Sequence, residues 1–220
     1  MHIPDGFLDL PIAAACFVLS ALALGFAARR TNDAIDDTRV ALLGVVSAGI
    51  FAGQMLNWPI PGGTSAHFVG GALAAILLGP HLGTLSVASV VVLQSLVFGD
   101  GGLTAIGANL LNMAIVEVYV GYVVFRLVRP WNPPVAAFAA GWLGITAGAV
   151  TTAVELGLSS TFNYELFTVL AIMGIGHFLL GLIEGAITLF VYRFIASARP
   201  DIVVRGPTPA DEPAETEASA

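Results

Sequence analysis

The chain has 220 residues, of which 57% are hydrophobic and only 10% are charged. Because soluble domains carry about 25% charged residues, this composition excludes a soluble globular domain and indicates a surface that faces lipid. The net charge is −7, and five of the 15 acidic residues lie in residues 199–220, a stretch that is also rich in Pro and Ala. We expect that stretch to be an acidic, disordered cytoplasmic tail and residues 1–198 to form one membrane-embedded helical bundle.

Apolar runs long enough to cross about 30 Å of hydrocarbon predict seven transmembrane helices. They lie near residues 9–29, 40–57, 65–80, 82–99, 104–126, 134–157 and 167–196. The break at Gly79-Pro80 separates the third from the fourth. No basic residue precedes the first run, and Arg29-Arg30 follow it where a signal-peptide cleavage site needs small neutral residues, so we expect a retained helix. The predicted fold class is an all-α integral membrane protein.

The arginines predict the orientation of these helices. With seven spans, all eight basic residues fall on one side of the membrane, and by the positive-inside rule that side is cytoplasmic. We therefore expect the N-terminus outside, the C-terminus inside and a multi-pass protein of the cell membrane. The basic residues are Arg29, Arg30, Arg39, Arg126, Arg129, Arg193, Arg199 and Arg205.

Ionisable residues within the spans are candidate functional groups, because a charge in the bilayer is costly. Glu117 lies mid-span in the fifth predicted helix, and His177 lies near the middle of the seventh. Glu184 lies deeper in the seventh helix, and Glu155 lies near the outer end of the sixth. A Glu117–His177 pair would satisfy both groups. It is either a buried structural pair or part of a proton or ion relay.

Amide side chains gather toward the outer half of the predicted bundle. Asn109 and Asn112 are three residues apart and share a helix face. Amides join membrane helices by hydrogen bonds, but this one-sided distribution favours a polar outer cavity. The residues concerned are Gln54, Asn57, Gln94, Asn109 and Asn112.

His2 suggests a metal chelate at the start of the chain. The Met1 amine, the His2 backbone nitrogen and the His2 imidazole Nδ1 can hold one ion in fused five- and six-membered rings. His67, which follows a Gly-rich turn with Thr64 or Ser65 as an expected helix cap, faces the same side and offers Nε2 as the fourth donor. Four nitrogens in a plane suit Ni²⁺ or Cu²⁺ and can hold Co²⁺. The amide proton must leave, so affinity should rise with pH.

Three segments resemble the CbiM/NikM family, the substrate-specific membrane components of energy-coupling factor transporters for cobalt and nickel. They are Met1-His2-Ile3-Pro4-Asp5-Gly6-Phe7-Leu8, Pro61-Gly62-Gly63-Thr64-Ser65-Ala66-His67-Phe68-Val69-Gly70-Gly71 and Gly107-Ala108-Asn109-Leu110-Leu111-Asn112-Met113. The resemblance covers residues 1–198. It implies that Met1, His2 and His67 hold Co²⁺ or Ni²⁺ as transported substrate, with no permanent cofactor.

The resemblance also implies partners. They are a CbiQ-like transmembrane coupling subunit, a CbiO-like ATPase and in many systems a small CbiN-like or NikN-like subunit. The chain lacks the G-x-x-x-x-G-K-[ST] phosphate loop, so the ATPase is expected to be a separate subunit. Membrane lipid surrounds the protein, and no nucleic acid is expected.

The leading hypothesis is therefore the metal-capture permease subunit of an ATP-driven importer, with cobalt for cobalamin biosynthesis favoured over nickel for nickel enzymes. A stand-alone secondary ion transporter or channel is the alternative from another class, although the sequence shows no inverted repeat. An enzyme is not expected, because neither H-E-x-x-H nor G-x-S-x-G occurs.

Overall fold

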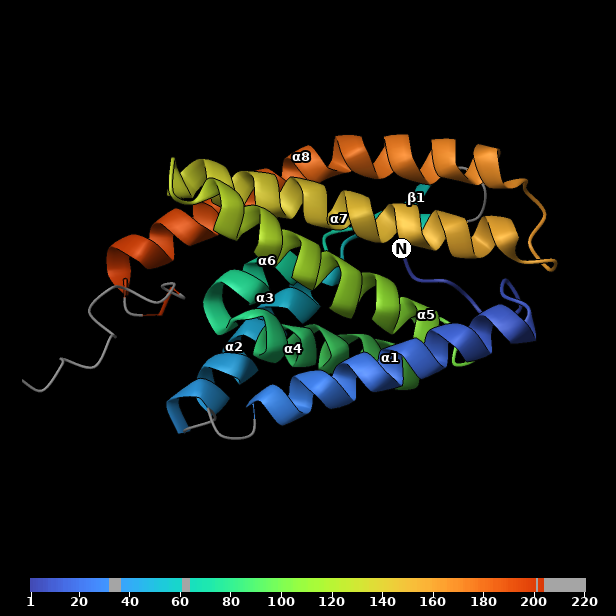
Figure 1. The fold of residues 1–220 in the computed structure, drawn as a ribbon, viewed down its shortest axis with the longest axis horizontal. Coiled ribbons are helices and arrows are strands. Elements are labelled where there is room, and N and C mark those ends of the chain that lie inside the picture. The colour runs from blue at the N-terminus through green and yellow to red at the C-terminus, as the bar shows by residue number, and fades with distance from the viewer. Residues whose placement is uncertain (32–36, 61–63, 201, 204–220) are drawn as a thin grey trace, which may run out of the picture.

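The computed structural model describes residues 1–31, 37–60, 64–200 and 202–203. The chain forms helices α1 (Leu10–Thr31) and α2 (Asp37–Gln54), strands β1 (Asn57–Ile60) and β2 (Thr64–His67), and helices α3 (Gly71–Leu78) and α4 (Pro80–Leu93), the last continuing as the π-helical segment η2 (Gln94–Phe98). Helix α5 (Ile106–Asn109) runs through the π-helical segment η3 (Leu110–Val116) into α6 (Glu117–Val128), and α7 (Pro133–Leu158) and α8 (Leu166–Ala198) complete the bundle. Figure 1 shows the helices lying side by side along one long axis.

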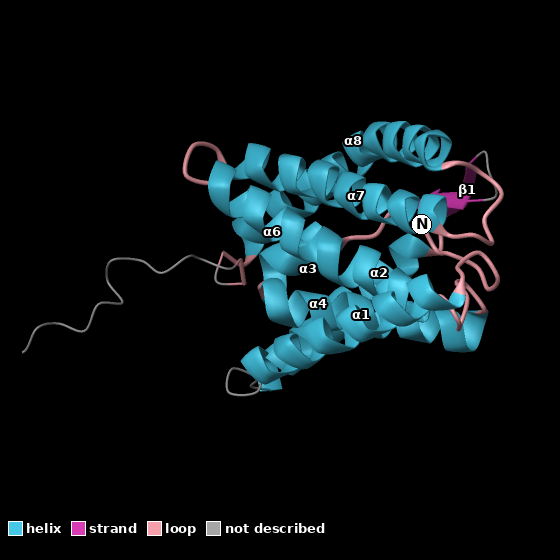
Figure 2. Ribbon diagram, turned by 45° about the vertical axis from the view of Figure 1, so that its right-hand side comes forward, coloured by secondary structure: helices cyan, strands magenta, loops and turns pink. Residues whose placement is uncertain are grey.

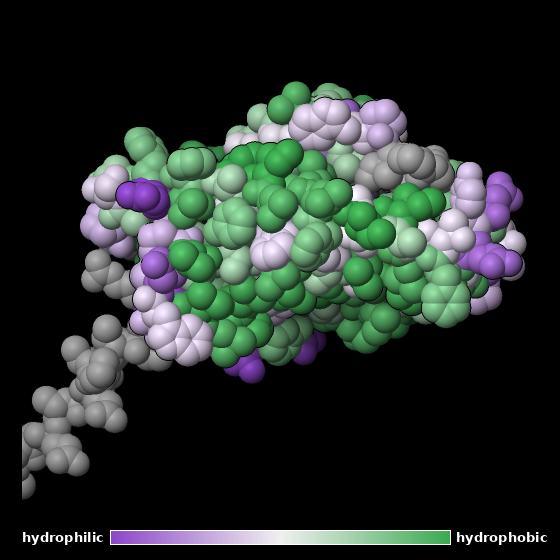
Figure 3. Space-filling model, turned by 90° about the horizontal axis from the view of Figure 1, so that it is seen from above, coloured by the Kyte–Doolittle hydropathy of each residue, from purple (hydrophilic) through white to green (hydrophobic). Residues whose placement is uncertain are grey.

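Five helical stretches among the described residues are long and apolar enough to cross a membrane: α1, α4 with η2, α5 through α6, α7 and α8. Their exposed side chains include large hydrophobic residues such as Phe17, Phe167, Phe190 and Phe194. Hydrophobic residues cover the middle of the molecule in Figure 3 and hydrophilic ones gather at its two ends. This distribution confirms the helical membrane fold class.

The predicted third helix over residues 65–80 is wrong. Its first part is strand β2, which pairs antiparallel with β1 so that Asn57 lies opposite His67. The helix starts only at Gly71, after Gly70 with φ 79°, and neither Thr64 nor Ser65 caps it. Eight helical residues rise about 12 Å, too little to cross a bilayer alone. The break at Gly79 (φ 82°) before Pro80 is confirmed.

The second predicted helix ends earlier than expected, at Gln54, and Asn57 belongs to the hairpin. Two predicted features lie outside the described residues. One is the Pro61-Gly62-Gly63 part of the second motif. The other is most of the acidic tail, of which residues 201 and 204–220 are not described.

Helices α7 and α8 pack along their lengths, as Figures 1 and 2 show. Glycines permit the close approach: a Cβ at Gly185 of α8 would lie 2.6 Å from the Phe138 carbonyl oxygen of α7. On the other side of α7, a Cβ at Gly148 would lie 2.9 Å from the Asn112 carbonyl oxygen. Small residues therefore bring these helices together, as in many membrane bundles.

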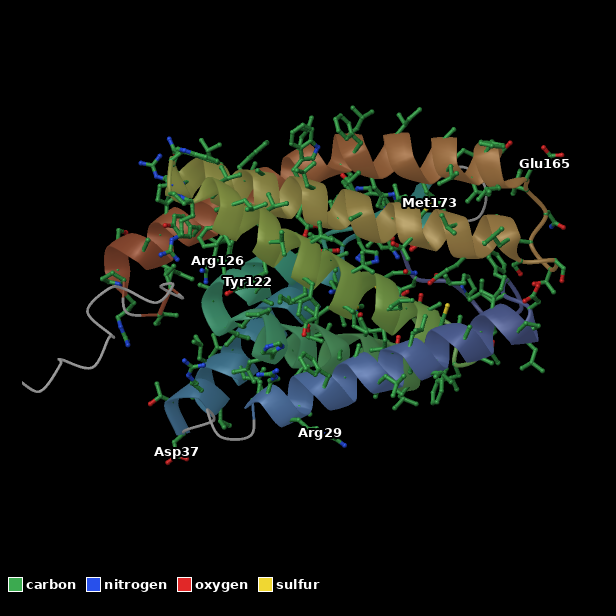
Figure 4. The ribbon with its side chains drawn as sticks, viewed as in Figure 1. Arg29, Asp37, Tyr122, Arg126, Glu165 and Met173 are labelled. Carbon is green, nitrogen blue, oxygen red and sulfur yellow. The ribbon has the colours of Figure 1, made fainter. Side chains whose placement is uncertain are left out.

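The two ends of the bundle differ in charge. Arg29, Asp37 and Arg126 lie toward one end, and Glu165 lies at the opposite end (Figure 4). The hairpin lies near the first residue of the chain (Figures 1 and 2), in the half of the bundle where Figure 4 shows Glu165.

Candidate metal centre

The first residues of the chain fold back into the bundle instead of extending away from it. Met1, His2 and Ile3 expose only 1%, 5% and 1% of their surface, and the chain start lies among the helices in Figure 1. Gly6 takes φ 83°, a conformation that L side chains disfavour, and so allows the turn between this segment and α1. The terminal amine is thus placed in the protein interior.

Hydrogen bonds from distant parts of the chain fix this segment. The Asn109 side chain accepts from Ile3 N at 2.7 Å and donates to Ile3 O at 3.1 Å. Gly102 N donates to the same carbonyl at 2.9 Å. Further along, the Asp5 carboxylate accepts from Thr104 N at 2.7 Å and from its hydroxyl at 2.5 Å, and these bonds hold the pKa of Asp5 below its usual range.

A second anchor lies where the segment meets α1. The Asp9 carboxylate caps the helix by accepting from Ile12 N at 3.2 Å, and it accepts from Ser160 N at 2.9 Å. The Ser159 hydroxyl accepts from Asp9 N and donates to Phe7 O, both at 2.9 Å. The α7–α8 loop and the N-terminal segment are therefore joined at both ends of the Phe7–Asp9 stretch.

The Met1 amine is held by strand β2. It donates to the Ser65 carbonyl oxygen at 2.6 Å and lies 3.4 Å from the Ser65 hydroxyl. Burial lowers the pKa of this amine to about 5, because the charged form loses its hydration. The amine is therefore neutral at pH 7 and has a lone pair to offer.

The predicted ligands His2 and His67 lie face to face. Their ring centroids are 4.8 Å apart with an interplanar angle of 21°. His67 Nδ1 lies 2.9 Å from the Phe68 carbonyl oxygen, which can only accept, so Nδ1 carries the proton and Nε2 carries a lone pair. That Nε2 is buried and has no hydrogen-bond partner among the described residues.

His2 is also neutral and unpartnered. Burial, followed by the charge of the neighbouring amine, lowers the pKa of its imidazole to about 3. Neither ring nitrogen has a hydrogen-bond partner in the part of the chain that the structure describes. The Asp100 carboxylate lies 3.7 Å from Nε2, and it favours a proton on Nε2 and a free lone pair on Nδ1.

These residues fit a transition-metal ion. Buried polar atoms are normally hydrogen-bonded, yet three imidazole nitrogens here are not, and a neutral amine lies beside them. Nitrogen donors of this kind suit Co²⁺, Ni²⁺ and Cu²⁺. The described residues hold no cluster of three or more His, Cys, Asp or Glu side chains that could bind a metal.

A polar vestibule connects His2 to the outside of the bundle. It is a cavity of about 530 Å³ between the hairpin and the loop at residues 99–102. His2, Asp5, Asn57, Ser65 and Asp100 line it. Asp100 was not predicted as a site residue; its signal is a single acid among the glycines Gly99, Gly101 and Gly102.

The five predicted amides do not form one cavity. Asn109 holds the N-terminal segment, and Asn57 lines the vestibule. Gln54 Nε2 instead donates to Val69 O at 2.8 Å, and Asn112 Nδ2 donates to Glu155 at 2.7 Å. Gln94 is buried, and its amide atoms have no partner within the described residues.

Glu117 and His177 do not pair. Glu117 Oε1 accepts from Gly71 N at 2.9 Å, and His177 Nδ1 donates to the Met173 carbonyl oxygen at 2.9 Å. Each side chain is buried and bonds to a main-chain atom, Glu117 to the first residue of α3 and His177 to its own helix.

Known proteins with this sequence pattern are metal transporters. A model of the CbiM family, described as the cobalt uptake substrate-specific transmembrane region, matches residues 2–202. A fused nickel transport protein NikMN of Archaeoglobus fulgidus is 54% identical over 95% of this chain and 70% of its own length. The cobalt transport protein CbiM of Sorangium cellulosum is 36% identical over 93% of this chain and 95% of its own length.

Solved structures agree with the sequence comparison. Crystal structures of a transition metal transporter and of a truncated form superpose with TM-scores of 0.87 and 0.86. Each covers 90% of this chain at 35% identity. These relatives are transport proteins and not enzymes. The chain is a multi-pass membrane protein that belongs to the CbiM family of cobalt and nickel transport proteins.

Proposed function

We propose that this protein is the metal-capture subunit of an ATP-driven importer and that it binds one Co²⁺ or Ni²⁺ ion through its first two residues and His67. The observation that carries the proposal is the meeting of a neutral, buried terminal amine with two neutral imidazoles, three of whose four nitrogens lack a hydrogen-bond partner among the described residues. Co²⁺ or Ni²⁺ is the transported substrate and not a resident cofactor.

The donors divide into a chelate and a single outside ligand. The Met1 amine, the His2 amide nitrogen and His2 Nδ1 supply three nitrogens, and His67 Nε2 supplies the fourth. Asn109, Asp5 and Asp9 hold the segment that carries the chelate, while the Phe68 carbonyl fixes the His67 tautomer. Such supporting contacts commonly determine metal affinity.

The proposed orientation places the vestibule outside the cell membrane and the arginine-rich end in the cytoplasm, as the positive-inside rule requires. An ion then enters past Asp100 and reaches His2. Release to the cytoplasm needs energy from elsewhere, because this chain has no phosphate loop. A CbiQ-like coupling subunit, a CbiO-like ATPase and a small CbiN-like or NikN-like subunit supply it. The names of the fused NikMN and LarMN relatives support the small subunit.

We favour cobalt, feeding cobalamin biosynthesis, and retain nickel as the second candidate substrate. Nitrogen ligands bind both ions, and intrinsic affinity rises from Co²⁺ to Ni²⁺. The relatives bear names of both kinds, so only a competition experiment separates the two.

The test is metal stoichiometry by elemental mass spectrometry. Wild type, His2→Ala and His81→Ala are purified and offered equimolar Co²⁺ and Ni²⁺. His81 is the matched control, because it lies on α4 in a pocket with Arg30 and Arg39 and bonds to Tyr119. We expect one ion per chain in wild type and His81→Ala and none in His2→Ala.

The ratio of bound cobalt to nickel reports the equilibrium preference of the site. Equal binding by wild type and His2→Ala, or no binding by either, would exclude the N-terminal chelate. Metal uptake into vesicles that contain this chain and no ATPase would instead support a stand-alone transporter or channel.

A further inference from the structure

Two buried carboxyl groups hold the main chain just after His67. Glu184 of α8 accepts from Val69 N at 3.0 Å and from Gly70 N at 2.9 Å, one bond to each oxygen. Glu117 of α6 accepts from Gly71 N at 2.9 Å. Three consecutive backbone N–H groups at the start of α3 therefore point at two acidic side chains from other helices.

The two carboxyl groups lie next to each other, because they bind the consecutive N–H groups of Gly70 and Gly71. Their exposed fractions are 1% for Glu184 and 0% for Glu117. Both oxygens of Glu184 accept from backbone donors, whereas Glu117 Oε2 has no hydrogen-bond partner among the described residues. The two carboxyl groups therefore differ in how many of their oxygens accept a hydrogen bond from the backbone.

The unpartnered Glu117 Oε2 is the oxygen on which a proton shared by the pair is most stable. Two ionised carboxylates have only acceptors, so they cannot hydrogen-bond, and like charges in contact repel strongly in a low-dielectric interior. A proton on Glu117 Oε2 supplies the missing donor. It leaves one negative charge on Glu184, facing two backbone N–H groups and the N-terminus of α3, where negative charge is favoured.

We propose that Glu117 and Glu184 form a buried proton-binding pair that holds one proton on Glu117, and that this pair positions His67 for metal capture. The second half rests on the proposed function. Val69 is two residues beyond His67, and its carbonyl oxygen accepts from Gln54 at 2.8 Å. Side chains from α2, α6 and α8 thus fix four backbone groups of residues 69–71.

Glycines make room for the pair. A Cβ at Gly71 would lie 2.9 Å from Glu117 Oε1, and one at Gly144 of α7 would lie 3.3 Å from Glu117 Cγ. The carboxyl group of Glu117 consequently occupies space that only a glycine neighbour leaves open, and the first residue of α3 can approach it closely.

The proposal predicts an asymmetry between two isosteric substitutions. In Glu117→Gln the amide nitrogen replaces the O–H donor to Glu184 and the amide oxygen still accepts from Gly71. In Glu184→Gln the amide nitrogen faces a backbone N–H, so two donors meet, and the negative charge is lost. We expect Co²⁺ affinity within about threefold of wild type for Glu117→Gln and a loss of about tenfold or more for Glu184→Gln.

The measurements are Co²⁺ titration calorimetry and infrared spectroscopy on the full chain in detergent, with Glu117→Leu as the variant that offers no donor. The wild-type spectrum should contain a protonated-carboxyl C=O band that shifts in D₂O and is missing in Glu117→Gln. Glu117→Leu should lose Co²⁺ affinity, because it cannot restore the hydrogen bond to Glu184.

Two results would contradict the proposal that Glu117 and Glu184 share one proton. One is an unchanged carboxyl band in Glu117→Gln, and the other is an equal loss of Co²⁺ affinity in the two Gln variants. If Glu184→Gln does not fold, the spectrum and affinity of Glu117→Gln still decide. A wild-type chain that binds no Co²⁺ would refute the proposed function instead, and the infrared comparison would then test the proton on its own.

Discussion

The side chain of Asn109 bonds to both backbone groups of Ile3, accepting from its nitrogen at 2.7 Å and donating to its oxygen at 3.1 Å. This paired contact joins the last residue of α5 to the residue that follows His2. An amide is the side chain that can do this, because it combines one acceptor and two donors on one planar group. Asn109 therefore positions the proposed chelate without belonging to it.

Replacing Asn109 by Leu should weaken metal binding. The variant keeps the side-chain volume but removes both bonds, so the N-terminal segment loses its deepest anchor. We expect Co²⁺ affinity to fall by about 10- to 100-fold, measured by titration calorimetry. Asn112→Leu is the matched control, since Asn112 lies three residues away and bonds to Glu155. It should lower thermal stability and leave affinity unchanged; equal affinities in the two variants would contradict the anchor.

Two glycines of the vestibule loop allow a second matched comparison. Gly99 and Gly101 have φ values of 66° and 91°, so alanine strains the backbone at both. A Cβ at Gly101 would lie 3.0 Å from His2 Nδ1, whereas nothing lies within 4 Å of one at Gly99. We expect Gly101→Ala to abolish metal binding and Gly99→Ala to retain it, by elemental analysis of the purified variants. Similar metal content in both would place the bound ion away from this face of His2.

The proposed site should bind metal more tightly as pH rises. Burial lowers the pKa of the Met1 amine to about 5 and, together with the charge of that amine, the pKa of His2 to about 3. Both are already neutral above those values, so the His2 amide proton is the one that the metal must displace. Affinity should therefore rise about tenfold per pH unit above pH about 6, and more steeply below pH about 5.

Titration calorimetry in buffers of different ionisation enthalpy counts the released protons. One proton per ion at pH 7 is expected. No proton release would mean that the amide nitrogen is not a ligand, and two would mean that the terminal amine is still charged at that pH.

Asp100 should attract the incoming ion. Its carboxylate is half-buried in the vestibule, 3.7 Å from His2 Nε2, and burial raises its pKa. Asp100→Asn keeps the shape and removes the charge. We expect slower Co²⁺ association by stopped-flow and a smaller dependence of that rate on ionic strength, because a focused charge speeds binding of its counter-ion. An unchanged salt dependence would show that the ion enters by another route.

The sequence predicted the bundle better than it predicted the segment that carries His67. Hydropathy places long helices well, and the break at Gly79-Pro80 follows from local chemistry. Residues 65–80 have the same apolar character, but β2 continues to His67 and the helix begins only at Gly71. The reason is tertiary: Glu184 and Glu117, far away in sequence, provide the acceptors that a helix would otherwise supply to Val69, Gly70 and Gly71.

The candidate site shows a similar division. His2, His67 and Asn109 were predicted from the residues and the family resemblance, and the structure brings them together. Asp100 was missed because a lone acid in a loop has no periodicity, and the expected Glu117–His177 pair is not formed because both side chains find backbone partners. Sequence identifies which residues are unusual in a membrane, but the partner of each depends on how the helices pack.

The burial of Met1 has a consequence for biogenesis. The Met1 amine binds the Ser65 carbonyl, and the segment that follows is held by Asn109 and then by Ser160. Since synthesis runs from the N-terminus, those contacts can form only after residues 65, 109 and 160 have been made. The N-terminal segment therefore cannot take up its buried position until α7 and the loop that follows it are in place.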